Sequence, residues 1–242
     1  MKAMIFAAGL GTRLKPFTDT MPKALVPVSG KPLLEHVILK LKSAGFDEVV
    51  INVHHFADQI IRFVEENDYF GIHIVFSDER DLLLDTGGGI KKARFFLDGN
   101  EPFLVHNVDI LSNVDLKELY QAHSLSDLAT MVVSERSTSR YLLFDEGNKL
   151  HGWTNISTNE IKPKGLTDIS ELKRLAYSGI QVISPAIFKL MDNYAEKFSI
   201  IDFYMDNVKS SAIKGYEPQN FKMLDVGKVD VLDKAEQFIL EL

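Results

Sequence analysis

The chain opens with a short apolar run, KAMIFAA at residues 2–8, that leads directly into a glycine loop. An apolar run bounded by glycine is typical of a strand buried on both faces of a parallel sheet. Gly9 and Gly11 allow the main chain to take positive φ and to approach a ligand closely. Consecutive N–H groups in such a turn bind anions, and three cations surround this one: Arg13, Lys15 and Lys23. The segment therefore predicts a polyphosphate site next to a buried strand.

The spacing of the loop excludes two other phosphate-binding motifs. A dinucleotide fingerprint requires a third glycine at position 14, where this chain has Leu14. A Walker phosphate loop requires G-x-x-x-x-G-K-[ST], a string that occurs nowhere in the chain. A plain turn with solvated cations would explain a lone Gly-x-Gly. The length and composition of residues 7–23 favour the phosphate site instead.

Strands alternate with helices through the first half of the chain. The apolar patterns predict strands at 48–53, 72–76 and 102–106. They predict helices at 32–44, 57–66 and 86–97. This alternation predicts a mostly parallel sheet with right-handed crossovers, and the first strand should lie near its centre.

From about residue 113 the pattern becomes more mixed. We expect helices at 115–123, 185–191, 200–209 and 229–242, and strands at 127–133, 141–144, 149–153 and 175–183, with a hairpin turn at Glu146-Gly147-Asn148. No linker rich in Pro, Gly or Ser separates the halves. We therefore expect one domain, residues 1–242, with lobes at about 1–112 and about 113–242. A ligand would lie across the carboxyl ends of the strands.

Composition narrows the class of protein. The chain has 242 residues, 45% hydrophobic and 25% charged, which allows one large α/β core. Cysteine is absent, so no disulfide and no thiolate nucleophile or metal ligand is available. The net charge of −7 argues against a nucleic-acid partner. The apolar run at 3–10 is too short for a membrane span and lacks secretion-signal features, so we expect a cytoplasmic protein with no membrane partner.

A longer string carries a family resemblance. Residues 10–36, LGTRLKPFTDTMPKALVPVSGKPLLEH, resemble the signature of the sugar-1-phosphate nucleotidylyltransferases. Four further segments follow in that family's order, at LDTGGGI (84–90), VHNVDI (105–110), Ser178–Gly179 and LDVG (224–227). The resemblance covers essentially the whole chain. The TGGG string is most similar to the short members, the N-acetylmuramate-1-phosphate uridylyltransferases and the heptose- or mannose-1-phosphate guanylyltransferases.

The resemblance implies an α/β fold of the Rossmann-like three-layer type, with a mostly parallel central sheet. It implies an enzyme that joins a nucleoside triphosphate (NTP) to a sugar 1-phosphate, giving an NDP-sugar and pyrophosphate. The first lobe would bind the nucleotide and the second the sugar phosphate. Both substrates are anions, so such an enzyme needs positioning and charge neutralisation rather than a protein nucleophile. Mg²⁺ is the expected cofactor, and we expect a monomer or a homodimer.

Two aspartates stand where a metal ion would be held. Asp109 follows the apolar strand FLVHNV, and Asp225 follows the short apolar run FKML. The resemblance implies that this pair binds Mg²⁺. Either residue alone could instead be a turn-former or a helix cap. Position 108 departs from the family pattern, because Val108 stands where glycine is usual, and this puts the sugar-side geometry in question.

The resemblance also assigns the substrate contacts. Lys23 would reach the α-phosphate and the acceptor phosphate, and Arg13 would hold the β- and γ-phosphates of the leaving pyrophosphate. The remaining nucleotide contacts would come from Ala8, Gly9, Gly11, Thr12 and Gly88. The sugar phosphate would meet Asn107, Ser178 and Gly179. The glycines of the TGGG string could instead only permit a tight helix start.

Two other functions stay open from the sequence alone. A cytidylyltransferase for a non-sugar phosphate such as phosphocholine would share the N-terminal signature. A non-catalytic subunit that senses nucleotide sugars could keep the fold, but we would expect it to have lost a catalytic cation or carboxylate. Lys23, Arg13, Asp109 and Asp225 are all present, so an enzyme is the favoured interpretation.

Overall fold

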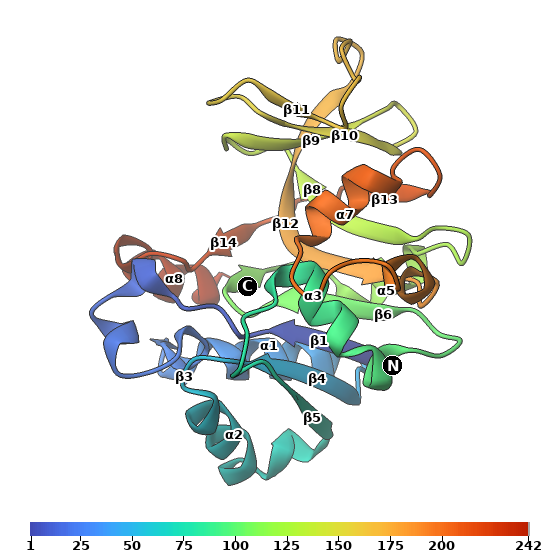
Figure 1. Cartoon of the computed structure of the whole chain (residues 1–242). Helices are drawn as coiled ribbons and strands as arrows, with labels where there is room; N and C mark the ends of the chain where they lie inside the picture. The colour runs from blue at the N-terminus through green and yellow to red at the C-terminus, as the bar shows by residue number, and fades with distance from the viewer. Residues whose placement is uncertain (242) are drawn as a thin grey trace.

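The computed structural model describes residues 1–241, and one large sheet runs through both halves of the chain (Figure 1). Its ten strands are β1 (Lys2–Phe6), β4 (Glu48–Val53), β5 (His73–Asp78), β6 (Phe103–Asn107), β8 (Ala129–Ser134), β9 (Arg140–Phe144), β10 (Leu150–Asn155), β11 (Glu160–Lys162), β12 (Lys173–Ile183) and β13 (Ile213–Tyr216). Two small sheets pair β2 (Pro27–Val28) with β3 (Lys31–Pro32) and β7 (Ile110–Ser112) with β14 (Met223–Asp225). The helices are α1 (Leu33–Ser43), α2 (Ala57–Glu66), α3 (Asp85–Lys92), α4 (Arg94–Leu97), α5 (Leu116–Ala122), α6 (Ile187–Met191), α7 (Ile200–Asn207) and α8 (Leu232–Leu240). None of these helices within residues 1–241 has the length and apolar character to cross a lipid bilayer.

The centre of the large sheet is parallel. β1 lies between β4 and β6, with Lys2 opposite Glu48 on one side and Phe103 on the other. β5 extends the parallel run beyond β4, whereas β12 joins β6 in the antiparallel sense. The predicted central position of the first strand is confirmed. Because the carboxyl ends of parallel strands meet at one edge of a sheet, the segments after β1, β4 and β6 lie close together.

Helices cover both faces of the parallel strands, which confirms the expected Rossmann-like α/β arrangement in three layers (Figure 1). Side chains of β1 alternate between the two faces. Ala3 and Ile5 pack in a core with α1, α2 and α5, and Met4 packs in a second core with α3, α4, α6 and α7. A strand buried on both sides must be apolar throughout, as the first run of the sequence is.

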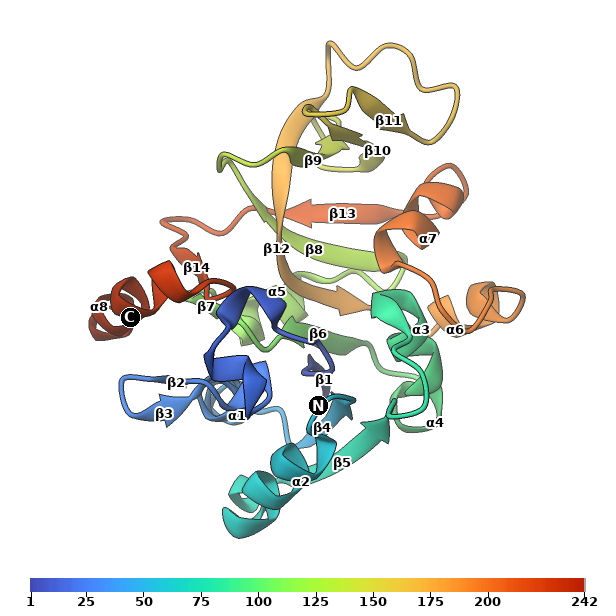
Figure 2. The same cartoon turned by 60° about the vertical axis from the view of Figure 1, so that its left-hand side comes forward.

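The strands β9, β10 and β11 project beyond the helices at one end of the molecule, at the top of Figures 1 and 2. β12 connects them to the centre, because its start pairs with β9 and its end pairs with β6. The predicted hairpin of β9 and β10 is confirmed. The register of β12 against β8 shifts between Tyr177 and Gln181, and this irregularity falls on the Ser178–Gly179 segment.

The structure differs from the expected elements in two helices and in several short strands. The helix expected at 86–97 is interrupted at Ala93, whose ψ of 2° is not helical. The helix expected at 229–242 begins with a 3-10 turn at Val229–Val231, and Leu242 lies outside the described residues. The short strands β2, β3, β7, β11, β13 and β14 were not predicted, because segments of two to four residues carry too little periodicity to be recognised.

Candidate active site

The glycine loop folds back on itself after β1. Gly11 has φ of 62°, and a Cβ there would lie 2.9 Å from Lys23 Cβ and from Thr18 Cγ2. The Thr18 hydroxyl donates to the Gly11 carbonyl at 2.9 Å. The turn therefore requires glycine at position 11. The expectation of positive φ is wrong for Gly9, where a Cβ would meet nothing within 4 Å.

A buried asparagine fixes the start of this loop. Asn52 at the end of β4 accepts hydrogen bonds through Oδ1 from the N–H groups of Ala7 at 2.7 Å and Ala8 at 3.3 Å. Its amide nitrogen donates to Glu79 Oε1 at 2.8 Å, and Glu79 Oε2 accepts from Leu84 N–H at 3.2 Å. Burial raises the pKa of Glu79. Sequence reasoning missed this pair, although a polar residue inside the apolar run EVVINV was a signal.

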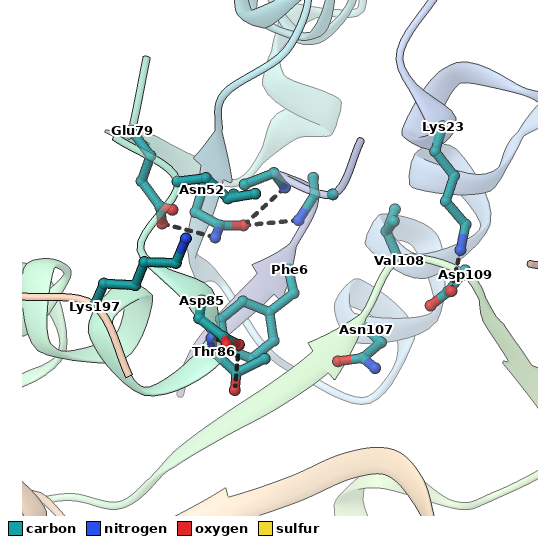
Figure 3. Close-up of a pocket in the computed structure, with 14 residues that line it drawn as sticks. Phe6, Lys23, Asn52, Glu79, Asp85, Thr86, Asn107, Val108, Asp109 and Lys197 are labelled. Atoms are coloured by element: carbon teal, nitrogen blue, oxygen red, sulfur yellow. Dashed lines mark hydrogen bonds and ion pairs between the residues drawn. The ribbon is translucent and has the colours of Figure 1, made fainter. Parts of the chain in front are cut away.

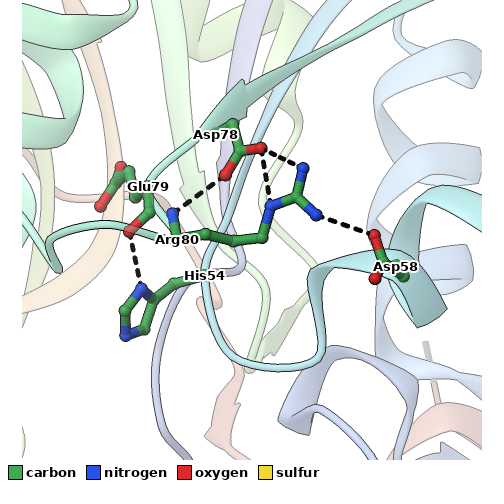
Figure 4. Close-up of polar contacts among 5 residues, drawn as sticks. All are labelled: His54, Asp58, Asp78, Glu79 and Arg80. Carbon is green, nitrogen blue, oxygen red and sulfur yellow. Dashed lines mark hydrogen bonds and ion pairs between the residues drawn. The ribbon is translucent and has the colours of Figure 1, made fainter.

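The segment after β5 is tied to its surroundings by a surface network (Figure 4). The Arg80 guanidinium donates to Asp78 at 2.8 Å and to Asp58 of α2 at 3.0 Å. His54 Nδ1 lies 2.7 Å from the Glu79 carbonyl oxygen. These contacts hold Arg80 outward and leave the Glu79 side chain directed into the protein, where it meets Asn52.

Lys23 and Asp109 form an ion pair at the end of β6. Both side chains are mostly buried, with 11% and 17% of their areas exposed. The structure therefore brings together two residues that lie far apart in the sequence, Lys23, which was expected to contact phosphate, and Asp109, which was expected to bind Mg²⁺. An ammonium beside a carboxylate in a partly desolvated cleft is a strong local charge pair.

Asp225 lies next to Asp109 because β14 pairs with β7. Asp225 is opposite Ile110 in this pairing, and the Val226 N–H donates to the Asp109 carbonyl at 2.8 Å. Asp225 is exposed at the cleft. The surrounding protein nevertheless partly desolvates its carboxyl group, which raises its pKa, and the nearby charge of Asp109 raises that pKa further. Three cations oppose that shift: Lys23, Arg13 and Arg136. A carboxyl group whose ionisation is disfavoured by a neighbouring carboxylate forms part of a site that suits a cation.

Arg13 reaches the same place from the glycine loop. A Cβ on Gly227 would lie 2.9 Å from an Arg13 guanidinium nitrogen and 2.6 Å from Asp225 Oδ1. Glycine in the LDVG segment therefore leaves the space that Arg13 and Asp225 occupy. The Thr12–Leu14 segment is a 3-10 turn with both Thr12 and Arg13 exposed.

A cavity of about 370 Å³ opens beside these residues (Figure 3). Of the predicted contacts, five line it: Ala8, Gly9, Lys23, Asn107 and Asp109. Its other lining residues are Phe6, Ala7, Asn52, Glu79, Leu83, Asp85, Thr86, Val108 and Lys197. Val108 also packs into the core with 4% of its area exposed. The side chain at this unusual position is therefore accommodated by the core.

The TGGG string packs against the segment that leads into α7. A Cβ on Gly88 would lie 2.0 Å from the Glu196 carbonyl oxygen, and a Cβ on Gly87 would lie 2.4 Å from the Phe198 ring. The Gly87 N–H donates to the Phe198 carbonyl at 2.9 Å. Gly88 is buried and is not part of the cavity lining. Close packing of two segments thus requires glycine at these positions, a reason different from both the nucleobase contact and the tight helix start considered from the sequence.

The predicted sugar-side residues lie at the irregular part of β12. Gly179 has φ of 77°, and a Cβ there would lie 2.8 Å from Asn107 Nδ2. Ser178 is 1% exposed, and its hydroxyl has no hydrogen-bond partner. Gly179 and Asn107 therefore touch across β12 and β6, next to Asp109, whereas neither Ser178 nor Gly179 lines the cavity itself.

A metal ion at this site would take few protein ligands. Residues 1–241 contain no cluster of three or more His, Asp or Glu side chains placed to hold an ion. Asp109 and Asp225 are a pair of carboxylates, which is the number that Mg²⁺ usually takes from a protein when substrate oxygens and water complete its shell. The donor set fits such an ion.

Comparison with known proteins identifies the family of this chain. The sequence profile of the family described as Nucleotidyl transferase matches residues 2–241. The chain belongs to this family. N-acetylmuramate alpha-1-phosphate uridylyltransferase of Neisseria meningitidis serogroup B is 34% identical over 189 residues, which cover 78% of this chain and 77% of that protein. The family resemblance expected from the sequence is confirmed.

A second curated relative carries a different base in its name. D-glycero-alpha-D-manno-heptose 1-phosphate guanylyltransferase of Campylobacter jejuni is 30% identical over 211 residues, covering 86% of this chain and 87% of the relative. Among solved structures, a putative glucose-1-phosphate thymidylyltransferase from Bacillus anthracis superposes with a TM-score of 0.82 at 19% identity, covering 100% of this chain and 96% of that one. This structural likeness confirms the fold.

Proposed function

We propose that this chain transfers a nucleotidyl group from an NTP to a sugar 1-phosphate and produces an NDP-sugar and pyrophosphate. The observation that carries the proposal is the convergence of Lys23, Asp109, Asp225 and Arg13 beside one cavity. The relatives named above are sugar-1-phosphate uridylyl- and guanylyltransferases. Neither the phosphocholine cytidylyltransferase nor the non-catalytic subunit is favoured by any of these relatives.

The reaction needs no protein nucleophile. A phosphate oxygen of the sugar 1-phosphate attacks the α-phosphorus, a new P–O bond forms, and the bond to the β-phosphate oxygen breaks so that pyrophosphate leaves. Lys23 would neutralise the α-phosphate and the attacking phosphate, and its ammonium can follow the charge as it moves. Arg13 would bind the departing pyrophosphate through its planar fork.

Asp109 and Asp225 would hold a divalent ion, and we propose that this ion is Mg²⁺. When bound, it would neutralise the phosphate oxygens of the substrates. Lys23 already bonds Asp109, so the same ammonium that contacts phosphate would orient one metal ligand.

The two halves of the chain would divide the substrates. We propose that about 1–112 holds the nucleotide, through Ala8, Gly9, Gly11, Thr12 and the cations above. About 113–242 would hold the sugar phosphate, through Ser178 and Gly179 together with Asn107 from the first half. The protein would work in the cytoplasm, where NTPs are made, as a monomer or a homodimer.

A substrate panel tests the function. Purified protein with Mg²⁺ is given each of five NTPs with several sugar 1-phosphates, and pyrophosphate release is measured for every pair. We expect at least one pair to release pyrophosphate far faster than the NTP alone. Release that never depends on the sugar 1-phosphate, or no release from any pair, would overturn the proposal.

A further inference from the structure

A lysine from the second half of the chain faces the substrate cavity. Lys197, in the loop before α7, lines the cavity with Asn52, Glu79 and Asp85. Figure 3 shows these residues at one end of the cavity, and Lys23 with Asp109 at the other end. Lys197 is exposed, and none of the ion pairs within residues 1–241 involves it. Its ammonium is therefore available to a ligand.

The main chain around Lys197 is held in place. The next carbonyl, that of Phe198, accepts hydrogen bonds from Gly87 at 2.9 Å and from Gly88 at 3.2 Å. The Phe198 N–H donates to the Leu84 carbonyl at 3.3 Å. The glycines of α3 thus fix the position from which Lys197 extends, so its reach into the cavity is set by the fold and not by a free loop.

Asn52 and Glu79, two polar side chains at this end of the cavity, are already engaged, and the exposed Asp85 accepts through Oδ1 from the Thr86 N–H at 2.6 Å. Asn52 bonds the main chain of Ala7 and Ala8 and donates to Glu79, whose two carboxylate oxygens accept from Asn52 and Leu84. Glu79 is 0% exposed. Lys197 is the cation that remains for a ligand group lying here.

Which group of the ligand lies beside Lys197 depends on where the phosphates bind. In the proposed function, on which this inference rests, the phosphates lie by the glycine loop, Lys23 and Asp109. The nucleoside then extends toward the opposite end, where Lys197 is (Figure 3). We propose that Lys197 donates a hydrogen bond to O4 of uracil or thymine, or to O6 of guanine, and selects bases by that contact.

A lysine ammonium can only donate hydrogen bonds. Uracil and thymine present the O4 acceptor and guanine presents O6, whereas cytosine and adenine present amino donors at the corresponding positions. A donor facing an amino group leaves both groups without a partner in a partly desolvated site. Lys197 therefore favours UTP, dTTP and GTP over CTP and ATP. The two curated relatives described above are named for uridylyl and guanylyl transfer, both of which involve carbonyl bases.

Nucleotide binding by calorimetry tests this assignment without requiring turnover. Dissociation constants are measured for UTP, dTTP, GTP, CTP and ATP with Mg²⁺, using the wild type, Lys197→Met and the control Lys92→Met. Lys92 is an exposed lysine of α3 outside the cavity lining. We expect the wild type to bind its best carbonyl base about 10- to 100-fold more tightly than CTP and ATP. Lys197→Met should lose most of that preference with CTP and ATP affinities unchanged, and Lys92→Met should keep it.

Three results would overturn the assignment. If Lys197→Met binds all five nucleotides more weakly by the same factor, Lys197 contacts phosphate. If all five affinities are unchanged, Lys197 is solvated and contacts no part of the nucleotide. If the wild type binds none of the nucleotides, the cavity does not hold the proposed ligand. Thermal unfolding of each variant checks that the fold is retained. Turnover separates the two proposals: selective binding without NDP-sugar formation refutes the proposed function alone, whereas NDP-sugar formation with an unaltered base preference in Lys197→Met refutes the role of Lys197 alone.

Discussion

The carboxylates of Asp109 and Asp225 come from segments more than a hundred residues apart in the chain, and the charge of Asp109 raises the pKa of Asp225. At the scale of single residues, this is the property that best marks the site. A carboxylic acid that resists ionisation beside another carboxylate releases its proton readily once a cation binds. The raised pKa of Asp225 therefore supports the proposal that Asp109 and Asp225 hold a metal ion.

Replacing either aspartate tests this directly. Asp109→Asn and Asp225→Asn keep the side-chain volume and weaken one metal ligand, so pyrophosphate release should fall by about 100-fold or more with little change in thermal unfolding. Asp233→Asn, at an exposed position on α8, is the matched control and should turn over normally. Wild-type rates in Asp109→Asn or Asp225→Asn would refute the metal assignment.

Lys40 provides a pH prediction at the same scale. This lysine of α1 donates to the Ser112 carbonyl, and burial lowers its pKa to about 8 from 10.5, against the opposing charge of Asp115. Between about pH 8 and pH 10.5, the unfolded chain binds more protons at Lys40 than the folded chain does. Stability conferred by the wild-type residue must therefore rise with pH across that interval.

The measurement compares wild type with Lys40→Met in urea unfolding at pH 7 and pH 10. At pH 7 the folded wild type carries a partly desolvated ammonium. The free energy of unfolding of Lys40→Met, relative to that of the wild type, should therefore be higher at pH 7 than at pH 10. Between pH 7 and pH 10, the free energy of unfolding of the wild type should rise relative to that of the variant by on the order of 1 kcal/mol. A difference that is the same at both pH values would show that the Lys40 amine is not desolvated.

At the scale of elements, the packing of α3 on the segment before α7 explains why a helix carries three successive glycines. An alanine in place of glycine usually stabilises a helix by about 1 kcal/mol. Gly88→Ala should instead destabilise the protein by about 2–4 kcal/mol, since its Cβ would lie 2.0 Å from the Glu196 carbonyl oxygen. Chemical unfolding measures the change, and Gly9→Ala, whose Cβ would meet nothing within 4 Å, is the stability control. A Gly88→Ala protein as stable as the wild type would show that the two segments are not in contact.

The same elements show which parts of the structure could be predicted. The strand and helix limits of β4 and α2 follow from local periodicity and agree with the structure residue for residue. The packing partner of the TGGG string could not be predicted, because the contact joins segments about a hundred residues apart and neither segment has a local pattern that names the other. The pairing of β7 with β14 was missed for the same reason, although it places Asp225 beside Asp109.

At the scale of the whole molecule, the parallel centre of the sheet brings the ends of β1, β4 and β6 to one edge, and the predicted phosphate loop lies there. Arg13, Lys23, Asp109 and Asp225 could be named from the sequence because they belong to a recognisable signature. Asn52, Glu79 and Lys197 could not, since a buried polar residue in a strand and a lysine in a loop have many uses and only the fold shows what they contact.

The most direct test of nucleotidyl transfer is to quantify both products of one reaction. Wild-type protein is incubated with Mg²⁺, UTP or GTP, and a sugar 1-phosphate that is active in the panel, and phosphorus NMR follows the mixture. Pyrophosphate and nucleotide sugar should appear in equal amounts, and both should stop forming when the divalent ion is chelated. Nucleoside monophosphate in place of the nucleotide sugar, or pyrophosphate formed at the same rate without the sugar 1-phosphate, would contradict transfer and indicate simple hydrolysis.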